Sequence, residues 1–278
     1  MAGKRGLIMG VANDHSIAWG IAKMLSAQGA ELAFTYQGDA LKKRVEPLAA
    51  ELGSKILIPC DVEDLGSVDA MFADIKKQWG KIDFLVHAIA FSDKNELKGR
   101  YADTTRENFS RTMLISCFSF VEIAKRAAPL MTAGGSMITL TYGGSTRVMP
   151  NYNVMGVAKA ALEASVRYLA GDFGPDNIRI NAISAGPVRT LAGAGIADAR
   201  LMFNYQKRHA PLRRTVTIEE IGGSAVYLLS DLSSGVTGEV HFVDSGYSIV
   251  SMPHPEALKM VDDAETAAEN AAAKRAAE

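Results

Sequence analysis

The chain of 278 residues is 48% hydrophobic and carries a formal net charge of -1. This length and composition allow one large core, and the lack of a strongly basic stretch argues against a nucleic-acid-binding surface. No window has the roughly 18 uninterrupted apolar residues of a membrane-spanning helix, and the first apolar run is too short for a signal peptide. We expect a cytoplasmic protein that binds neither nucleic acid nor a membrane.

Short β-rich runs alternate with longer segments of helical period, which is typical of βα units around a parallel sheet. The predicted strands are residues 6–9, 31–36, 55–60, 82–87, 137–142, 179–184 and 239–243. The predicted helices are residues 17–28, 39–52, 65–79, 104–129, 152–173 and 217–229. Seven parallel strands with flanking helices predict an α/β fold, a single-domain, doubly wound (Rossmann-like) sheet over residues 1–253.

Local signals refine these boundaries. Thr104 with Glu107 and Thr217 with Glu220 each form a capping-box pattern that opens a helix. Pro47 predicts a kink or break in its helix. Cys60 and Cys117 lack a CxxC spacing and are expected to be reduced thiols in the core.

Two segments lack this order. Residues from about 187 to 216 show no clean periodicity but mix large apolar side chains with charges, which predicts a partly helical lid over a pocket. Residues 254–278 are rich in alanine and charge and have almost no large apolar side chain. We interpret them as a solvated tail without a function of its own.

The loop after the first strand is a candidate nucleotide site. Gly10 permits a tight exit from the strand, and the Ser16 hydroxyl with the amides that follow it, including that of Ile17, would bind a pyrophosphate at a helix N-terminus. The G-x-G-x-x-G fingerprint is absent, however, and a plain tight βα turn is the alternative. The position at the first βα junction favours the nucleotide site.

The end of the second strand bears on the choice of cofactor. A carboxylate at this position normally binds the adenosine ribose, and this chain has Gln37 instead. No Lys or Arg stands beside it to bind an extra phosphate, so NADH is favoured over NADPH. Asp61 and Val62, after the third strand, are predicted to lie against the adenine, and a helix cap is the alternative role of the Asp61 carboxylate.

A second group of candidates is Tyr142, Tyr152 and Lys159. Two helical turns place Tyr152 and Lys159 on one helix face, and Tyr142 ends the preceding strand at the same edge of the sheet. A protonated phenol can donate to an oxygen that becomes negative when hydride adds to a carbonyl or to an unsaturated thioester, and no metal is required. The spacing also arises by chance, and two interfacial tyrosines with a surface lysine are the alternative.

Further motifs resemble a known family. The alternating pattern, the run at residues 181–187 and the Tyr/Lys pair resemble the short-chain dehydrogenase/reductase superfamily, whose usual spacing is Tyr-x3-Lys. The Tyr-x6-Lys spacing and the Gly10-x5-Ser16-Ile17 loop are instead similar to its divergent branch, the bacterial NADH-dependent enoyl-acyl-carrier-protein reductases. Segments 152–156, 189–191 and 213–216 add to the match, which covers residues 3 to about 252.

The resemblance implies a reaction and roles. NADH would reduce the double bond of a trans-enoyl thioester carried on the phosphopantetheine arm of acyl carrier protein, in fatty-acid elongation. Tyr152 would stabilise the enolate oxygen, Lys159 would hold the nicotinamide ribose, Tyr142 would line the acyl pocket and assist protonation, and Ser92 would contact substrate. The implied cofactor contacts are Gly10, Ser16, Ile17, Gln37, Asp61, Val62, Ile89, Lys159, Val188, Arg189, Thr190, Leu191 and Ala192.

The resemblance also implies partners. A homotetramer is expected, with the helices at 105–130 and 152–173 as packing faces. The acidic carrier protein would meet a basic patch, for which the candidates are Arg200, Lys207, Arg208, Arg213 and Arg214. Ala88 and Ala90 stand where relatives often carry Ser and Gly, which leaves pocket width and inhibitor response open.

Two other functions fit the same fold. A ketone or alcohol dehydrogenase would use the same cofactor and tyrosine, and a nucleotide-sensing protein would bind the cofactor without turnover. A sensor need not keep Tyr152 and Lys159, so their presence favours an enzyme.

Overall fold

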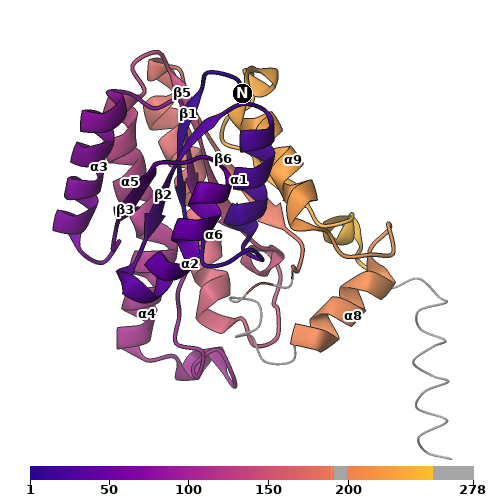
Figure 1. The fold of residues 1–278 in the computed structure, drawn as a ribbon. Coiled ribbons are helices and arrows are strands. Elements are labelled where there is room, and N and C mark those ends of the chain that lie inside the picture. Colours follow the sequence, from indigo (N-terminus) through magenta and orange to yellow (C-terminus); the bar gives the residue numbers. More distant parts are fainter. Residues whose placement is uncertain (189, 191–198, 253–278) are drawn as a thin grey trace, which may run out of the picture.

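Seven parallel strands form one sheet in the order β3-β2-β1-β4-β5-β6-β7 in the computed structural model, which describes residues 1–188, 190 and 199–252 (Figure 1). The strands are β1 Arg5–Met9, β2 Glu31–Tyr36, β3 Ile56–Pro59, β4 Phe84–His87, β5 Gly135–Thr141, β6 Ile178–Ala185 and β7 Val240–Val243. The predicted doubly wound sheet is confirmed. The order reverses at β1, which lies between β2 and β4, so the carboxyl ends of these strands flank a crevice.

The described residues, which exclude 189, 191–198 and the segment after 252, contain eight α-helices. They are α1 Ile17–Ala27, α2 Gly38–Glu51, α3 Leu65–Trp79, α4 Arg106–Met113, α5 Ser119–Ala127, α6 Asn153–Phe173, α8 Ala199–His209 and α9 Ile218–Leu229. Pro47 lies inside α2 and does not end it. It is on the exposed face, where the carbonyl that loses its intrahelical donor can bond water.

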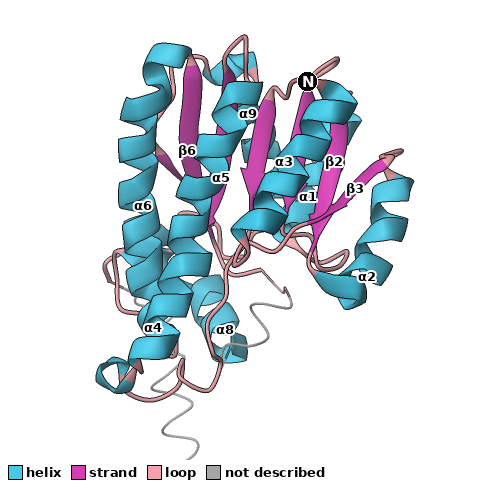
Figure 2. Ribbon diagram, turned by 90° about the vertical axis from the view of Figure 1, so that its left-hand side faces the viewer, coloured by secondary structure: helices cyan, strands magenta, loops and turns pink. Residues whose placement is uncertain are grey.

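Both faces of the sheet are covered (Figure 2). Helices α3, α5 and α6 pack on one face, and α1, α2 and α9 pack on the other. The inner strands β1, β2, β4, β5 and β6 are largely buried on both sides and are therefore mostly apolar, whereas β7, at one edge of the sheet, is partly exposed. Helix α8 lies beyond the carboxyl ends of the strands (Figure 1).

The segment predicted as one helix from Thr104 toward Pro129 is divided. The N-cap is Thr105, whose hydroxyl accepts from the Asn108 amide at 3.2 Å, whereas the Thr104 hydroxyl donates to the Tyr101 carbonyl. Glu96, from the preceding loop, accepts from the Thr105 amide at 2.9 Å, the role predicted for Glu107. A π-helical turn, Leu114–Phe118, then separates α4 from α5. Such turns add one residue and re-aim side chains.

The last predicted cap is correct. The Thr217 hydroxyl accepts from the Glu220 amide at 3.2 Å, and the Glu220 carboxylate accepts from the Thr217 amide at 2.9 Å. Both cysteines are buried free thiols, as expected. In the described part of the chain, no helix combines the length and apolarity that crossing a membrane requires.

Candidate active site

A cavity of about 570 Å³ opens at the carboxyl edge of the sheet. Loops after six strands line it, each through at least one residue: Gly10 after β1, Gln37 after β2, Val62 after β3, Ile89 after β4, Tyr142 after β5 and Val188 after β6. Ser16, Ile17, Ser92, Tyr152, Lys159 and Thr190 also line it. Asp61 bonds Gln37 from outside this lining, and Arg189, Leu191 and Ala192 lie outside the described residues.

The β1 loop approaches β4 closely. Gly10 has φ +101°, and a Cβ atom there would lie 2.1 Å from the Ala88 carbonyl oxygen, so only glycine fits. The Ser16 hydroxyl accepts from the amides of Ala12 at 3.0 Å and Asn13 at 3.1 Å. The side chain therefore shapes the loop from within, and Ile17 and Ala18 of the α1 N-terminus face the cavity beside it. A helix N-terminus of this kind favours an anion.

Gln37 and Asp61 meet at the end of β2 and β3. The Gln37 side-chain amide donates to the Asp61 carboxylate at 3.0 Å. The end of β2 has Gln37 where a carboxylate is usual, and Asp61, which follows the neighbouring strand β3, places a carboxylate beside it. Lys42 lies over the Tyr36 ring, with its Nζ 5.9 Å from the ring centroid, so one cation is nearer to this edge than the sequence indicated.

Tyr142, Tyr152 and Lys159 form one wall of the cavity. The rings of Tyr142 and Tyr152 pack edge to face with centroids 5.1 Å apart. Lys159, on α6, is buried and donates from Nζ to the Leu140 carbonyl at 2.8 Å. Tyr152 precedes α6 directly, so the helix N-terminus and the end of β5 together set the position of all three side chains.

Burial determines the charge of these groups. It raises the pKa of Tyr142 to about 12 and raises the pKa of Tyr152 well above its usual value. It also lowers the pKa of Lys159 to about 8, against the opposing effect of Cys117 and Glu163. At pH 7 both phenols are protonated donors and Lys159 is mostly charged. This wall can stabilise negative charge that develops on an oxygen.

The loop after β4 is held by polar side chains of the α4 region. The Ser116 hydroxyl, in the π-helical turn, accepts from the Phe91 amide and donates to the Phe91 carbonyl, both at 2.9 Å. The Ser92 hydroxyl accepts from Thr112 at 2.9 Å, so it is engaged inside the protein although it borders the cavity. The one-residue register change of the π turn directs Ser116 toward this loop.

Several lining residues were not predicted. They are mainly apolar and include Phe91, Leu97, Met155, Met202 and Phe203. Met155 could have been found, since it lies three residues after Tyr152 and shares its helix face. Met202 and Phe203 belong to α8 within the predicted lid, where no clean helical period indicates which side chains face the pocket.

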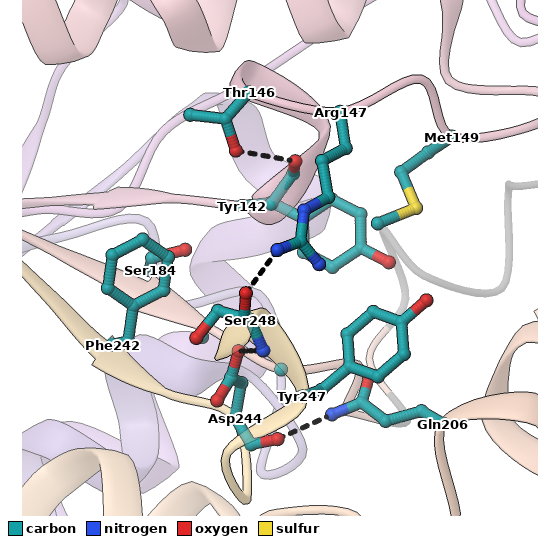
Figure 3. Close-up of a pocket in the computed structure, with 13 residues that line it drawn as sticks. Tyr142, Thr146, Arg147, Met149, Ser184, Gln206, Phe242, Asp244, Tyr247 and Ser248 are labelled. Carbon is teal, nitrogen blue, oxygen red and sulfur yellow. Dashed lines mark hydrogen bonds between the residues drawn. The ribbon is translucent and has the colours of Figure 1, made fainter. Parts of the chain in front are cut away.

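A second chamber of about 310 Å³ shares Tyr142, Ala185 and Gly186 with the first (Figure 3). Arg147, five residues before Tyr152, donates to the carbonyls of Ser248 and Val250. The Asp244 carboxylate accepts from the Ser248 amide at 2.8 Å, and its carbonyl accepts from Gln206 of α8 at 3.0 Å. The segment from Asp244 to Val250 therefore bonds both the loop before Tyr152, through Arg147, and α8, through Gln206.

The candidate basic residues near α8 are in different environments. Arg214 forms two hydrogen bonds with the Glu220 carboxylate, at 2.8 and 2.6 Å, and Arg213 donates to the Arg208 carbonyl. Lys207 and Arg208 are exposed on the last turn of α8. The side chain of Arg200 is not among those described. A patch in the described part of this region would depend on Lys207, Arg208 and Arg213.

Comparison with known proteins gives consistent results. The sequence profile described as Enoyl-(Acyl carrier protein) reductase matches residues 10–248. The chain is 76% identical over 262 residues to enoyl-[acyl-carrier-protein] reductase [NADH] 2 of Rhizobium meliloti (strain 1021), covering 94% of this chain and 98% of that protein.

Solved structures agree. An enoyl-(acyl-carrier-protein) reductase of Anaplasma phagocytophilum in complex with NAD is 59% identical, with a TM-score of 0.89 over 91% of this chain and 97% of that one. The Bacillus cereus enoyl-acyl carrier protein reductase with NADP+ and indole naphthyridinone is 50% identical, with a TM-score of 0.89 over 90% and 98%.

Proposed function

Since the chain belongs to the family of NADH-dependent enoyl-acyl-carrier-protein reductases, we propose that Tyr152, Lys159 and Tyr142 carry the reduction of an enoyl thioester in this protein. The family reaction, reduction of the carbon–carbon double bond of an enoyl-acyl-carrier-protein with NADH in bacterial fatty-acid synthesis, is the function of this chain. The observation that supports the roles is that the protonated Tyr152 phenol and Lys159 line the same cavity of about 570 Å³.

The cavity fits a dinucleotide at three points. The close backbone approach at Gly10 leaves room that a side chain would fill. The α1 N-terminus at Ile17 would face the pyrophosphate, and Gln37, which lines the cavity, would bind the adenosine ribose. Val62 and Ile89 would pack against the adenine, and Lys159 would anchor the nicotinamide ribose. Asp61, Val188, Arg189, Thr190, Leu191 and Ala192 complete the proposed contacts. NADH supplies the hydride that reduces the β-carbon.

The side chains of the wall then act on the thioester. As the β-carbon gains hydride, negative charge develops on the thioester oxygen, and Tyr152 donates a hydrogen bond to it. The Lys159 ammonium stabilises the same charge from the cofactor side. Tyr142, whose ring contacts Tyr152, lines the acyl pocket and assists protonation of the enolate at its α-carbon. Because both phenols are protonated at pH 7, neither requires activation.

The acyl chain would occupy the apolar end of the cavity. Leu97, Met155, Met202 and Phe203 supply this surface, and Ser92 lines the same cavity. Residues from about 187 to 216, including α8, would act as the substrate lid. Residues 1–253 are proposed as the reductase domain, and the tail expected at 254–278 lies outside the described residues.

The proposed assembly is a cytoplasmic homotetramer that receives its substrate on acyl carrier protein. Large apolar side chains are exposed along α4, the π turn and α6, including Phe109, Phe118 and Tyr168. An exposed apolar surface of this kind favours association between copies. Light scattering after gel filtration tests this proposal, because a stable monomer at micromolar concentration would refute it.

Substrate comparison tests the proposed reaction. NADH oxidation is followed with a trans-enoyl thioester, with the matching β-ketoacyl thioester, and without acceptor. We expect turnover of the enoyl substrate at a rate at least about 100-fold above that of the ketone, because the apolar end of the cavity suits an unsaturated β-carbon better than a polar β-carbonyl. Turnover of the ketone alone would indicate a carbonyl reductase, and cofactor binding without any turnover would indicate a sensor.

A further inference from the structure

Glu163 is a buried carboxylate that the proposed reaction does not use. It lies four residues after Lys159 on α6, and 7% of its surface is exposed. Its Oε1 accepts from the Thr141 hydroxyl at 2.6 Å. Burying a carboxylate costs free energy unless hydrogen bonds and a nearby cation compensate it, so its presence here requires an explanation.

Lys159 and Glu163 both form hydrogen bonds with the carboxyl end of β5. Lys159 donates to the carbonyl of Leu140, and Glu163 binds the side chain of the next residue, Thr141. Leu140 and Thr141 precede Tyr142 directly, and both line the cavity. Two side chains on one face of α6 therefore hold the end of β5 at the point where the catalytic wall begins.

Titratable side chains from several elements lie around Lys159, and their protonation states determine the charge that it meets. His87 on β4 is buried, and its low pKa of about 3 keeps it neutral. Cys117, in the π turn, has its pKa raised by burial and is a neutral thiol. Tyr142 and Tyr152 are neutral phenols. Among these neighbours, Glu163 is the one with a carboxyl side chain.

We propose that Glu163 is a positioning residue for Lys159: bound to Thr141, its carboxylate holds α6 against the end of β5 and keeps the buried Lys159 ammonium charged. The inference rests on the proposed role of Lys159 in the reaction. Attraction between the two charges favours the protonated lysine. Loss of the carboxylate should therefore release the lysine proton at lower pH.

The test replaces Glu163 by glutamine, which keeps an oxygen that can accept from Thr141 but removes the charge. The matched control is Asp172→Asn, the same charge change on an exposed part of the same helix. Lys159 and Glu163 are one helical turn apart, and removing one unit charge from the neighbourhood of a buried ammonium is expected to shift its pKa by about one pH unit.

Two readouts are used, and one is independent of catalysis. The first is the rate at which acetic anhydride modifies Lys159, followed by mass spectrometry as a function of pH, because only the neutral amine reacts. We expect the midpoint to fall by about one pH unit in Glu163→Gln and to stay unchanged in Asp172→Asn. The second is kcat/KM with an enoyl thioester, whose decline at alkaline pH should move by the same amount.

The outcomes separate the inference from the proposed function. Unchanged midpoints in Glu163→Gln, or an equal shift in the control, would overturn the inference whatever the enzyme does. A loss of kcat/KM that is the same at every pH would also overturn it, because a merely structural role gives that result. A Lys159→Met variant with normal kcat/KM would instead overturn the proposed role of Lys159.

A second pair of variants tests the inference even if Glu163→Gln folds poorly. Thr141→Val removes the hydroxyl that holds the carboxylate, and Thr141→Ser keeps it. We expect kcat to fall about threefold to tenfold in the valine variant and to recover in the serine variant. Equal kcat in both variants would refute the positioning role.

Discussion

Asp61 is predicted to set the preference for NADH. Its carboxylate accepts from the side-chain amide of Gln37, the residue proposed to bind the adenosine ribose. A phosphate on that ribose would meet the negative charge of Asp61, and Asn at this position removes the charge at nearly constant volume. We therefore predict that Asp61→Asn improves the use of NADPH.

The size of the effect follows from Coulomb's law. A phosphate held by Gln37 would lie about 6 Å from the carboxylate, since the hydrogen bond between the two side chains is 3.0 Å long. With ~1.5 to 2 negative charges on the phosphate and a water-like dielectric constant of ~80, the repulsion is about 1 to 1.4 kcal/mol. That corresponds to a five- to tenfold change in kcat/KM. Ionic strength should reduce it, because the site is at the surface.

The assay compares kcat/KM for NADPH and NADH with one enoyl thioester at low salt. Asp61→Asn should raise the NADPH to NADH ratio by about five- to tenfold, mainly through NADPH. Asp74→Asn, an equal charge change further along α3, should leave the ratio unchanged. A ratio in Asp61→Asn within twofold of the wild-type value would refute the reasoning.

Three further predictions concern the loop, the core and the carrier. Gly10→Ala should weaken NADH binding at least about tenfold in a fluorescence titration, because its φ is positive and its Cβ would lie 2.1 Å from the Ala88 oxygen; unchanged affinity would contradict the proposed loop. His87 has a folded pKa of about 3 against 6.5 for the free side chain, so the unfolded chain binds the extra proton between these values and stability falls as pH drops. This group should remove about 1.6 kcal/mol of unfolding free energy between pH 6.5 and 5, measured by urea unfolding, and His87→Gln should lose that slope. Lys207→Glu with Arg208→Glu should lower kcat/KM for a carrier-bound enoyl substrate about tenfold but spare a coenzyme A thioester, and equal losses would exclude a carrier-binding role.

The sheet was predictable because its strands are short apolar runs separated by amphipathic helices, and buried parallel strands require that pattern. The helix at 104–129 was not, since capping by Glu96 joins residues nine apart across a loop. The π turn also has no signature in helical periodicity, although Ser116 and the loop after β4 depend on it.

The candidate site was partly predictable for a similar reason. Tyr142, Tyr152 and Lys159 are close in the chain, so local geometry places them near one another. The Gln37–Asp61 bond joins two strands, and the Glu163–Thr141 bond joins a helix to a strand. Their partners are decided by tertiary packing, which spacing along the chain does not encode.

The central claim is that Tyr152 stabilises negative charge on the thioester oxygen. The most direct measurement is kcat for enoyl thioester reduction by Tyr152→Phe, together with the NADH dissociation constant of the same variant. The account predicts a loss in kcat of about 100-fold, the effect of removing one donor to a developing oxyanion, with NADH affinity within twofold of wild type. An unchanged kcat would contradict the claim.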